Sequence, residues 1–157
     1  EGFVFRRAEL DDHKQLAALF GKVFEYSYPT PVYKSEYIKE VMQKQQSVFY
    51  LACREEKICG AASLEINKEY ANAEVTDCAV LSCCRGNGLL NELIRSLEEE
   101  ARRLDLVCLY SLSRALVYGI NIGLAAEGYA YYGRLINNCL IGGRYEDMNI
   151  WQKPINE

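Results

Sequence analysis

Two glycines separate a strand-like apolar segment from a long amphipathic segment near the middle of the chain. Residues 74–89 read EVTDCAVLSCCRGNGL, and residues 88–103 repeat apolar positions at helical spacing. Gly86 and Gly88 allow the backbone to turn sharply and to approach a ligand closely. The N–H groups of this loop and of the first helical turn would converge on one point, which favours a pyrophosphate. Arg85 can add charge-assisted hydrogen bonds there.

Other glycine-rich nucleotide loops do not fit this segment. A Rossmann loop needs three glycines after the first strand and an acidic residue about 20 positions later. A Walker loop needs Gly-Lys followed by Ser or Thr, and the segment has neither pattern. A glycine-rich turn that binds no ligand remains an alternative for this segment taken alone.

The periodicity of the whole chain predicts an α+β domain with mixed strand pairing, in which an antiparallel sheet continues into a β-α-β unit. Ser35 is expected to cap the second helix, and Glu98 to Glu100 are expected to face solvent on the third. Pro29 and Pro31 place a loop between the first two helices. The expected elements are strand 3–8, helix 11–23, helix 35–42, strands 48–54, 58–66 and 72–81, helix 88–103, strand 106–112, helix 115–127, and strands 129–141 and 145–153.

Length and composition limit the class of protein. The 157 residues suit one domain, 1–157, that can bury a sizeable core. The net charge of −4 implies no large basic face, so we expect no nucleic-acid partner. No apolar stretch approaches the roughly 20 residues that span a bilayer, and residues 1–7 do not form a signal peptide. We therefore expect neither a membrane partner nor a leader, and a homodimer stays open.

The seven cysteines are an odd number and form no Cys-x-x-Cys pair, and the chain has one histidine, His13. This pattern argues against a zinc site, so no metal is expected. Most of the cysteines lie in apolar runs, which favours a reducing, cytoplasmic setting. Cys83 and Cys84 are adjacent, but a catalytic thiol needs a nearby base, and His13 is distant in sequence.

The glycine segment resembles the acetyl-CoA-binding motif of the GCN5-related N-acetyltransferases (GNAT superfamily). Their pattern is Gln/Arg-x-x-Gly-x-Gly/Ala, which Gly86 and Gly88 match, while Cys83 departs from it. The resemblance covers nearly the whole chain. It implies a mixed, mostly antiparallel sheet of about seven strands flanked by about four helices, with strands four and five splayed apart. It implies acetyl-CoA as cosubstrate.

A narrower resemblance links the chain to the β-lysine N-acetyltransferases. It rests on separated motifs in the same order, namely SYPTPVY at 27–33, DCAVL at 77–81, SRA at 113–115, GIN at 119–121, GRLINN at 133–138 and EDMNIWQK at 146–153. Members of that family usually carry extra sequence before this domain. The chain begins at Glu1 without Met, which is consistent with the C-terminal part of a longer chain. The implied acceptor is β-lysine, a small amine.

The resemblance assigns cofactor contacts to the end of the fourth strand, the glycine loop and the following strand and helix. The residues carried over are Cys78, Ala79, Val80, Leu81, Arg85, Gly86, Asn87, Gly88, Leu89, Ser113, Asn121 and Leu124. The backbone of the strand would hold the pantetheine. The free N–H groups near Ala79 and Val80 could polarise the thioester carbonyl.

Acetyl transfer needs a base, because an alkyl ammonium has a pKa near 10. Glu74 is the first candidate, since some members of the superfamily use a glutamate at this position, and Asp77 is the second. Strict strand alternation places these two on opposite faces, unless a bulge intervenes. The usual acid, a tyrosine, is replaced by Leu124, which leaves Tyr118 as a substitute or the thiolate without an acid. Glu74 as a solvated strand residue and Tyr118 as packing remain alternatives.

β-Lysine offers a carboxylate, a β-ammonium and the reacting amine. Arg134 or Arg114 could pair with the carboxylate. The candidates for the β-ammonium are Glu146, Asp147, Asn137, Asn138 and Asn149, each of which could instead be a surface or turn residue. The tyrosines that could line the pocket, or simply pack in the core, are Tyr28, Tyr33, Tyr129, Tyr131 and Tyr132.

Three functions are therefore compared. The first is acetylation of β-lysine. The second is acetylation of another small amine, an amino acid or a protein lysine. The third is a non-catalytic acyl-CoA-binding module, which the departures at Cys83 and Leu124 leave open.

Overall fold

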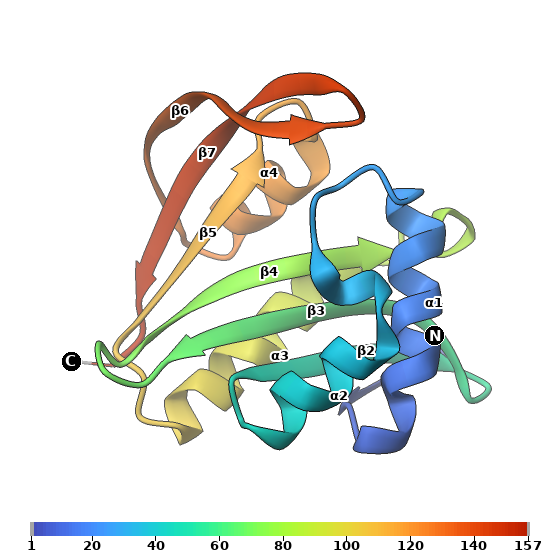
Figure 1. The fold of residues 1–157 in the computed structure, drawn as a ribbon. Helices are drawn as coiled ribbons and strands as arrows, with labels where there is room; N and C mark the ends of the chain where they lie inside the picture. The colour runs from blue at the N-terminus through green and yellow to red at the C-terminus, as the bar shows by residue number, and fades with distance from the viewer. Residues whose placement is uncertain (1, 157) are drawn as a thin grey trace.

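A computed structural model of the chain describes residues 2–156 and shows one mixed sheet with helices on both faces (Figure 1). The strand order is β1-β2-β3-β4-β5-β7-β6, antiparallel throughout except for the parallel pair β4 and β5. The elements are β1 (Val4–Arg7), α1 (His13–Phe24), α2 (Ser35–Gln43), β2 (Ser47–Arg54), β3 (Lys57–Asn67), β4 (Asn72–Val80), α3 (Leu89–Arg103), β5 (Cys108–Arg114), α4 (Tyr118–Ala126), β6 (Ala130–Ile141) and β7 (Arg144–Pro154). Short 3₁₀ turns lie at Leu10–Asp12, Pro31–Tyr33 and Ser82–Cys84. The predicted order of strands and helices and the predicted mixed sheet are confirmed.

Helices cover the central strands from both sides. Figure 1 shows α1 and α2 in front of the sheet and α3 behind it. Because both faces of β2 are covered, seven of its eight residues are buried instead of alternating with polar ones. The largest fully buried side chains include Phe20 of α1, Phe49 of β2 and Leu93 of α3. The core therefore lies around β2, β3 and β4, and the C-terminal strands extend from it.

The boundaries around β5 differ from the expected ones for a local reason. The N–H of Leu106 bonds to the carbonyl of Ala101 at the end of α3, so the strand begins only at Cys108. The N–H of Ala115 bonds to the carbonyl of Asp147 and prolongs the pairing with β7, so α4 begins only at Tyr118. The strand 106–112 is thus displaced to Cys108–Arg114, and the helix 115–127 is shortened.

The expected cap at Ser35 is wrong. Lys34 is the N-cap of α2, and no side chain accepts a hydrogen bond from the free N–H groups there. Ser35 is instead the first residue inside the helix, and its carbonyl oxygen lies 3.1 Å from Nδ1 of His13.

The expectation that Glu98 and Glu100 face solvent is also wrong. Their residues are only 4% and 3% exposed. Lys153 of β7 donates to both oxygens of Glu98, at 3.1 and 3.0 Å, and Arg7 of β1 donates to Glu100 at 2.8 Å. Arg7 and Lys153, from opposite ends of the chain, thus compensate the charges of two buried carboxylates. The helical pattern of the sequence had predicted that these carboxylates face solvent. None of the helices within residues 2–156 is long and apolar enough to cross a membrane.

Candidate active site

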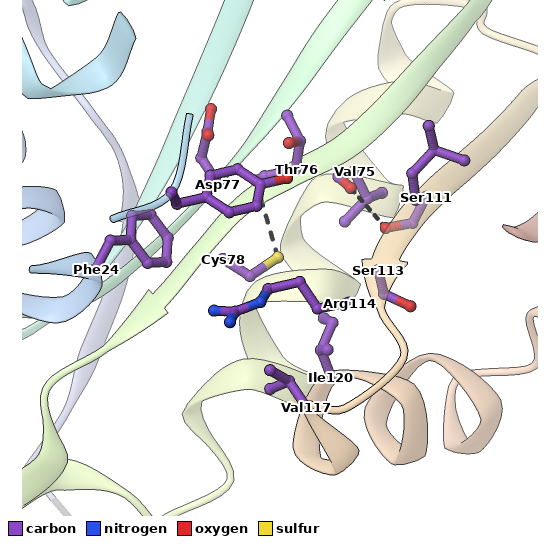
Figure 2. A pocket seen from close by; sticks show the side chains of 12 residues that line it. Phe24, Val75, Thr76, Asp77, Cys78, Ser111, Ser113, Arg114, Val117 and Ile120 are labelled. Carbon is purple, nitrogen blue, oxygen red and sulfur yellow. Dashed lines mark hydrogen bonds between the residues drawn. The ribbon is translucent and has the colours of Figure 1, made fainter. Parts of the chain in front are cut away.

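The parallel pair β4 and β5 is joined over only three residues. Asn72, Ala73 and Glu74 of β4 oppose Cys108, Leu109 and Tyr110 of β5, and the backbone ladder then stops. The next link is made by a side chain, because Ser111 Oγ donates to the carbonyl of Val75 at 2.8 Å. Beyond it the two strands diverge, as Figure 2 shows. The predicted splay between the fourth and fifth strands is confirmed.

A bulge in β4 lies at the start of this opening. Ser63 of β3 opposes Thr76 and Ala61 opposes Ala79, so Asp77 and Cys78 together face the single residue Ala62. Asp77 takes a left-handed backbone conformation, with φ of 51°. Its carboxylate accepts hydrogen bonds from Ser63 Oγ at 3.1 Å and from Thr30 Oγ1 at 3.4 Å. Since Ser63 opposes Thr76, the bulge turns Asp77 toward the face that carries Glu74.

Both carboxylates are less acidic than usual. Burial, followed by the charges of Glu65 and Asp77, raises the pKa of Glu74 to about 7. Burial raises the pKa of Asp77 to about 6, although the hydrogen bond from Ser63 opposes this change. A carboxylate whose pKa lies near neutrality can accept a proton at physiological pH and release it again, as a general base must.

Two adjoining clefts occupy the opening. The smaller cleft has an empty volume of about 600 Å³, and the larger has about 1340 Å³ and leads to the glycine loop. Both are lined by Phe24, Cys78, Arg114, Val117 and Ile120. Because they share these five residues, a ligand lying in the larger cleft can reach the smaller one.

The glycine loop is shaped to receive an anion at the end of the larger cleft. Gly86 and Gly88 have φ of +83° and +71°, and a Cβ on either would meet no atom within 4 Å. Gly88 is the N-cap of α3, and no side chain bonds to the free N–H groups of the first turn. A helix N-terminus without a capping side chain offers these donors to a phosphate. The residues present therefore fit the pyrophosphate of acetyl-CoA.

The structure places only part of the predicted cofactor set at these clefts. The residues that line the larger cleft are Cys78, Val80, Arg85, Gly86, Gly88 and Leu89, and Ser113 lines the smaller one. Ala79 and Leu81 are buried in the core, so only their backbone could contribute. The side chain of Asn87 bonds to the carbonyl of Cys84 at 2.9 Å and lines neither cleft.

Asn121 and Leu124 do not lie where the prediction put them. Leu124 is fully buried in the core, because it lies on the inner side of α4. Asn121 has its hydrogen-bonding capacity filled within the protein. Its Oδ1 accepts from Ser113 Oγ, Asn149 Nδ2 and Trp151 Nε1 at 2.6, 2.9 and 2.9 Å, and its Nδ2 donates to the carbonyls of Arg114 and Val117. This network fixes α4 against β5 and β7.

The predicted acceptor-binding residues separate into two groups. Arg114 lines both clefts, and its guanidinium makes a double hydrogen bond to Glu146 at 2.9 and 2.7 Å. The other residues line neither cleft. Arg134 pairs with Asp147 at 3.7 Å, the N–H of Asn137 bonds to Asp147 Oδ1 at 2.9 Å, Asn149 is buried and Asn138 is exposed.

Tyr118 and most of the predicted pocket tyrosines also lie away from the clefts. Tyr118 is the first residue of α4, is 72% exposed and lines neither cleft, although the next two residues, Gly119 and Ile120, line the larger one. Of the five tyrosines, only Tyr28 lines the smaller cleft, where burial raises the pKa of its hydroxyl to about 12. Tyr33 supports it by donating to the Tyr28 carbonyl at 2.8 Å. Tyr129 is buried, whereas Tyr131 and Tyr132 are exposed on β6.

Sequence reasoning missed several lining residues. Phe24 is the last residue of α1, Val117 lies between β5 and α4, and Gly119 and Ile120 lie in the first turn of α4. Their apolar character is indistinguishable from core packing in the sequence. One signal in the sequence could have indicated that Val117 and Ile120 line the cleft. They follow just after a strand that ends at the opening. Among residues 2–156, no three His, Cys, Asp or Glu side chains converge as a metal site would require.

Two curated proteins are similar in sequence to nearly the whole chain. The chain is 46% identical over 153 residues to N-acetyltransferase YodP of Bacillus subtilis (strain 168), covering 98% of this chain and 55% of that protein. It is 42% identical over 151 residues to the Beta-lysine N(6)-acetyltransferase of Methanosarcina mazei (strain ATCC BAA-159 / DSM 3647 / Goe1 / Go1 / JCM 11833 / OCM 88), covering 96% and 55%. The chain thus spans about half the length of these curated relatives.

Solved structures share the fold. An N-acetyltransferase from Staphylococcus aureus Mu50 aligns with a TM-score of 0.86 and 14% identity, covering 99% of this chain and 100% of that one. The yncA protein of Salmonella typhimurium, solved with its cofactor acetyl-CoA, aligns with a TM-score of 0.86 and 15% identity, covering 100% and 96%. A sequence profile described as the Acetyltransferase (GNAT) family matches residues 13–116. The chain belongs to the GNAT family of acetyltransferases.

Proposed function

We propose that this chain transfers the acetyl group of acetyl-CoA to the terminal amine of β-lysine. The observation that carries the proposal is the pair of adjoining clefts between β4 and β5, with the glycine loop and the uncapped start of α3 at one end and Asp77 on the wall at the other, three residues after Glu74. The β-lysine acceptor is supported by the 42% identity to the Methanosarcina mazei protein of that name. The seven cysteines, all free thiols, support a reducing, cytoplasmic setting.

The larger cleft would hold the cosubstrate. The N–H groups at the start of α3 and the exposed Arg85 would bind the pyrophosphate. The pantetheine would then follow β4 past Val80 to Cys78, where the strand edge has lost its partner. When bound, acetyl-CoA supplies the thioester that the amine attacks. Burial raises the pKa of Cys78 to about 12, so its thiol stays neutral and does not compete as a nucleophile.

The smaller cleft would hold the acceptor amine. Asp77 lies on its wall, so its carboxylate can bind the incoming ammonium. Glu74 does not line this cleft but lies three residues earlier on the same face of β4, so it would take the proton through a water. Its pKa, which burial raises to about 7, suits Glu74 to accept a proton near neutral pH. Holding both reactants in adjoining clefts supplies further rate by proximity.

No side chain is assigned as an acid toward the leaving thiolate. Tyr118 points to solvent and Leu124 is apolar and buried. A thiol has an ordinary pKa near 8.5, so the thiolate can leave and be protonated by solvent. We therefore propose transfer without a protein acid.

The experiment is turnover of acetyl-CoA with β-lysine, α-lysine and putrescine, measured as free CoA and identified by mass spectrometry. The highest kcat/KM is expected for β-lysine, with the acetyl group on its terminal amine. Higher turnover of another amine would replace the acceptor but keep the chemistry. CoA binding without acetylation of any amine would favour the non-catalytic binding module, in which Glu74→Gln would have no effect.

A further inference from the structure

Arg114 lies where the two clefts meet, and Glu146 is its ion-pair partner. Arg114 ends β5, and its Nε and Nη2 donate to the two oxygens of Glu146 on β7, at 2.9 and 2.7 Å. The double hydrogen bond fixes the plane of the guanidinium. The Glu146 side chain is only 10% exposed, and that of Arg114 is 32% exposed. Both oxygens of Glu146 are therefore bonded to Arg114. Glu146 is not available to bind the acceptor ammonium, although the sequence made it a candidate for that role.

One end of this guanidinium remains available. Within residues 2–156, no hydrogen bond is made by Nη1 of Arg114, which carries two N–H donors. Figure 2 shows Arg114 reaching from the end of β5 across the gap toward Cys78 of β4. Arg114 is the only basic residue among those lining the smaller cleft, and Asp77 is the only acidic one. This cleft thus has a free guanidinium donor on β5 and an acidic residue, Asp77, on the wall formed by β4.

We propose that Nη1 of Arg114 binds the carboxylate of an amino-acid acceptor and that Glu146 is the positioning residue that aims it. The inference rests on the proposed function, because it concerns the acceptor half of the same site. The ion pair is formally neutral, so the subsite selects by directed hydrogen bonds rather than by net charge. It distinguishes diamino acids from simple diamines, which have no carboxylate to place there. Arg134, the alternative from the sequence, is paired with Asp147 and lines neither cleft.

The test uses two amines that differ by one group. Pentane-1,4-diamine is β-lysine without its carboxylate. Replacing Arg114 alone would leave Glu146 unpaired and poorly exposed, so the double variant Arg114→Met/Glu146→Met removes both charges together. KM for β-lysine is expected to rise at least tenfold with little change in kcat, whereas kcat/KM for pentane-1,4-diamine should change less than about threefold. Arg134→Met is the matched control and should leave both amines unaffected.

Glu146→Gln tests the positioning role separately. It keeps the size of the side chain and one acceptor oxygen, but no longer fixes both guanidinium nitrogens. A smaller rise in KM for β-lysine is expected, about three- to tenfold, again with the diamine unchanged. Glu146→Asp should recover part of the loss by restoring a carboxylate.

Three results would overturn the inference. Equal losses for β-lysine and pentane-1,4-diamine would assign the pair a structural role. A rise in KM for acetyl-CoA would place Arg114 in cofactor binding, since it lines the larger cleft as well. The third is an unchanged preference for β-lysine in the double variant. Calorimetric titration of each amine into the CoA-saturated protein gives the same comparison as Kd values, so the subsite is tested even if β-lysine is not acetylated.

Discussion

The pH dependence of the reaction follows from the two carboxylates of β4. If Glu74 accepts the proton with a pKa of about 7, kcat/KM rises with pH through about 7 and levels off above it. The ionised fraction is then about 0.9 at pH 8 and about 0.1 at pH 6, so the rate falls about tenfold between them. Glu74→Gln should abolish this limb and lower the plateau by about 10² to 10⁴, equivalent to about 3–5 kcal/mol of barrier.

The charge of the neighbouring Asp77 predicts the direction in which the pH dependence should move when that charge is removed. Asp77 is one of the charges that raise the pKa of Glu74. Asp77→Asn removes that charge, so the limb should move to lower pH, while KM for the amine increases because Asp77 no longer binds the ammonium. The assay is initial-rate kinetics from pH 5.5 to 9 for the wild type and both variants. A limb that persists in Glu74→Gln, or moves upward in Asp77→Asn, would refute this assignment of the base.

Three further predictions concern the loop, the core and the splay. Gly86→Val should raise the acetyl-CoA Kd at least tenfold in calorimetry, because a φ of +83° strains a β-branched residue. The matched control is Gly143→Val, which has a φ of +81° in the β6–β7 turn and should leave this Kd unchanged. Lys153→Met leaves Glu98 buried without its main partner, at a cost of about 3 kcal/mol. With an unfolding entropy of about 2.1 cal/mol/K per residue, this loss lowers Tm by about 10 °C. Lys44→Met breaks an exposed ion pair and should lower Tm little. Equal decreases in Tm for the two variants would contradict the role of Lys153. Ser111→Ala removes the hydrogen bond to the Val75 carbonyl, the last link between the two strands. This variant should raise the acetyl-CoA Kd and lower Tm only slightly. An unchanged Kd would show that this link does not shape the cleft.

Much of the fold could be predicted because its signals are local. The alternation in the strands, the apolar stripe of α3 and the glycines at 86 and 88 each act over a few residues, and the order of elements follows from them. The glycine loop was found for the same reason. Of the residues predicted within this one continuous segment, 78–89, six line the larger cleft, namely Cys78, Val80, Arg85, Gly86, Gly88 and Leu89.

What the sequence did not show depends on contacts between distant segments. Glu98 is buried because Lys153, 55 residues later, donates to it, and no local pattern contains that partner. Arg114 and Glu146 are 32 residues apart, so neither residue alone indicates the pair. Asn121 looked like a cofactor ligand, but Trp151 and Asn149 fill its oxygen. From the sequence, a bulge could be stated only as the condition under which Glu74 and Asp77 would share a face. The register between β3 and β4 shows that the bulge exists.

The most direct test of the account is a crystal structure of the protein with CoA bound. We expect the pyrophosphate at the N–H groups that open α3, beside Gly86 and Gly88, and the pantetheine along β4 as far as Cys78. CoA bound elsewhere, or a closed gap between β4 and β5 with no CoA at saturating concentration, would contradict it.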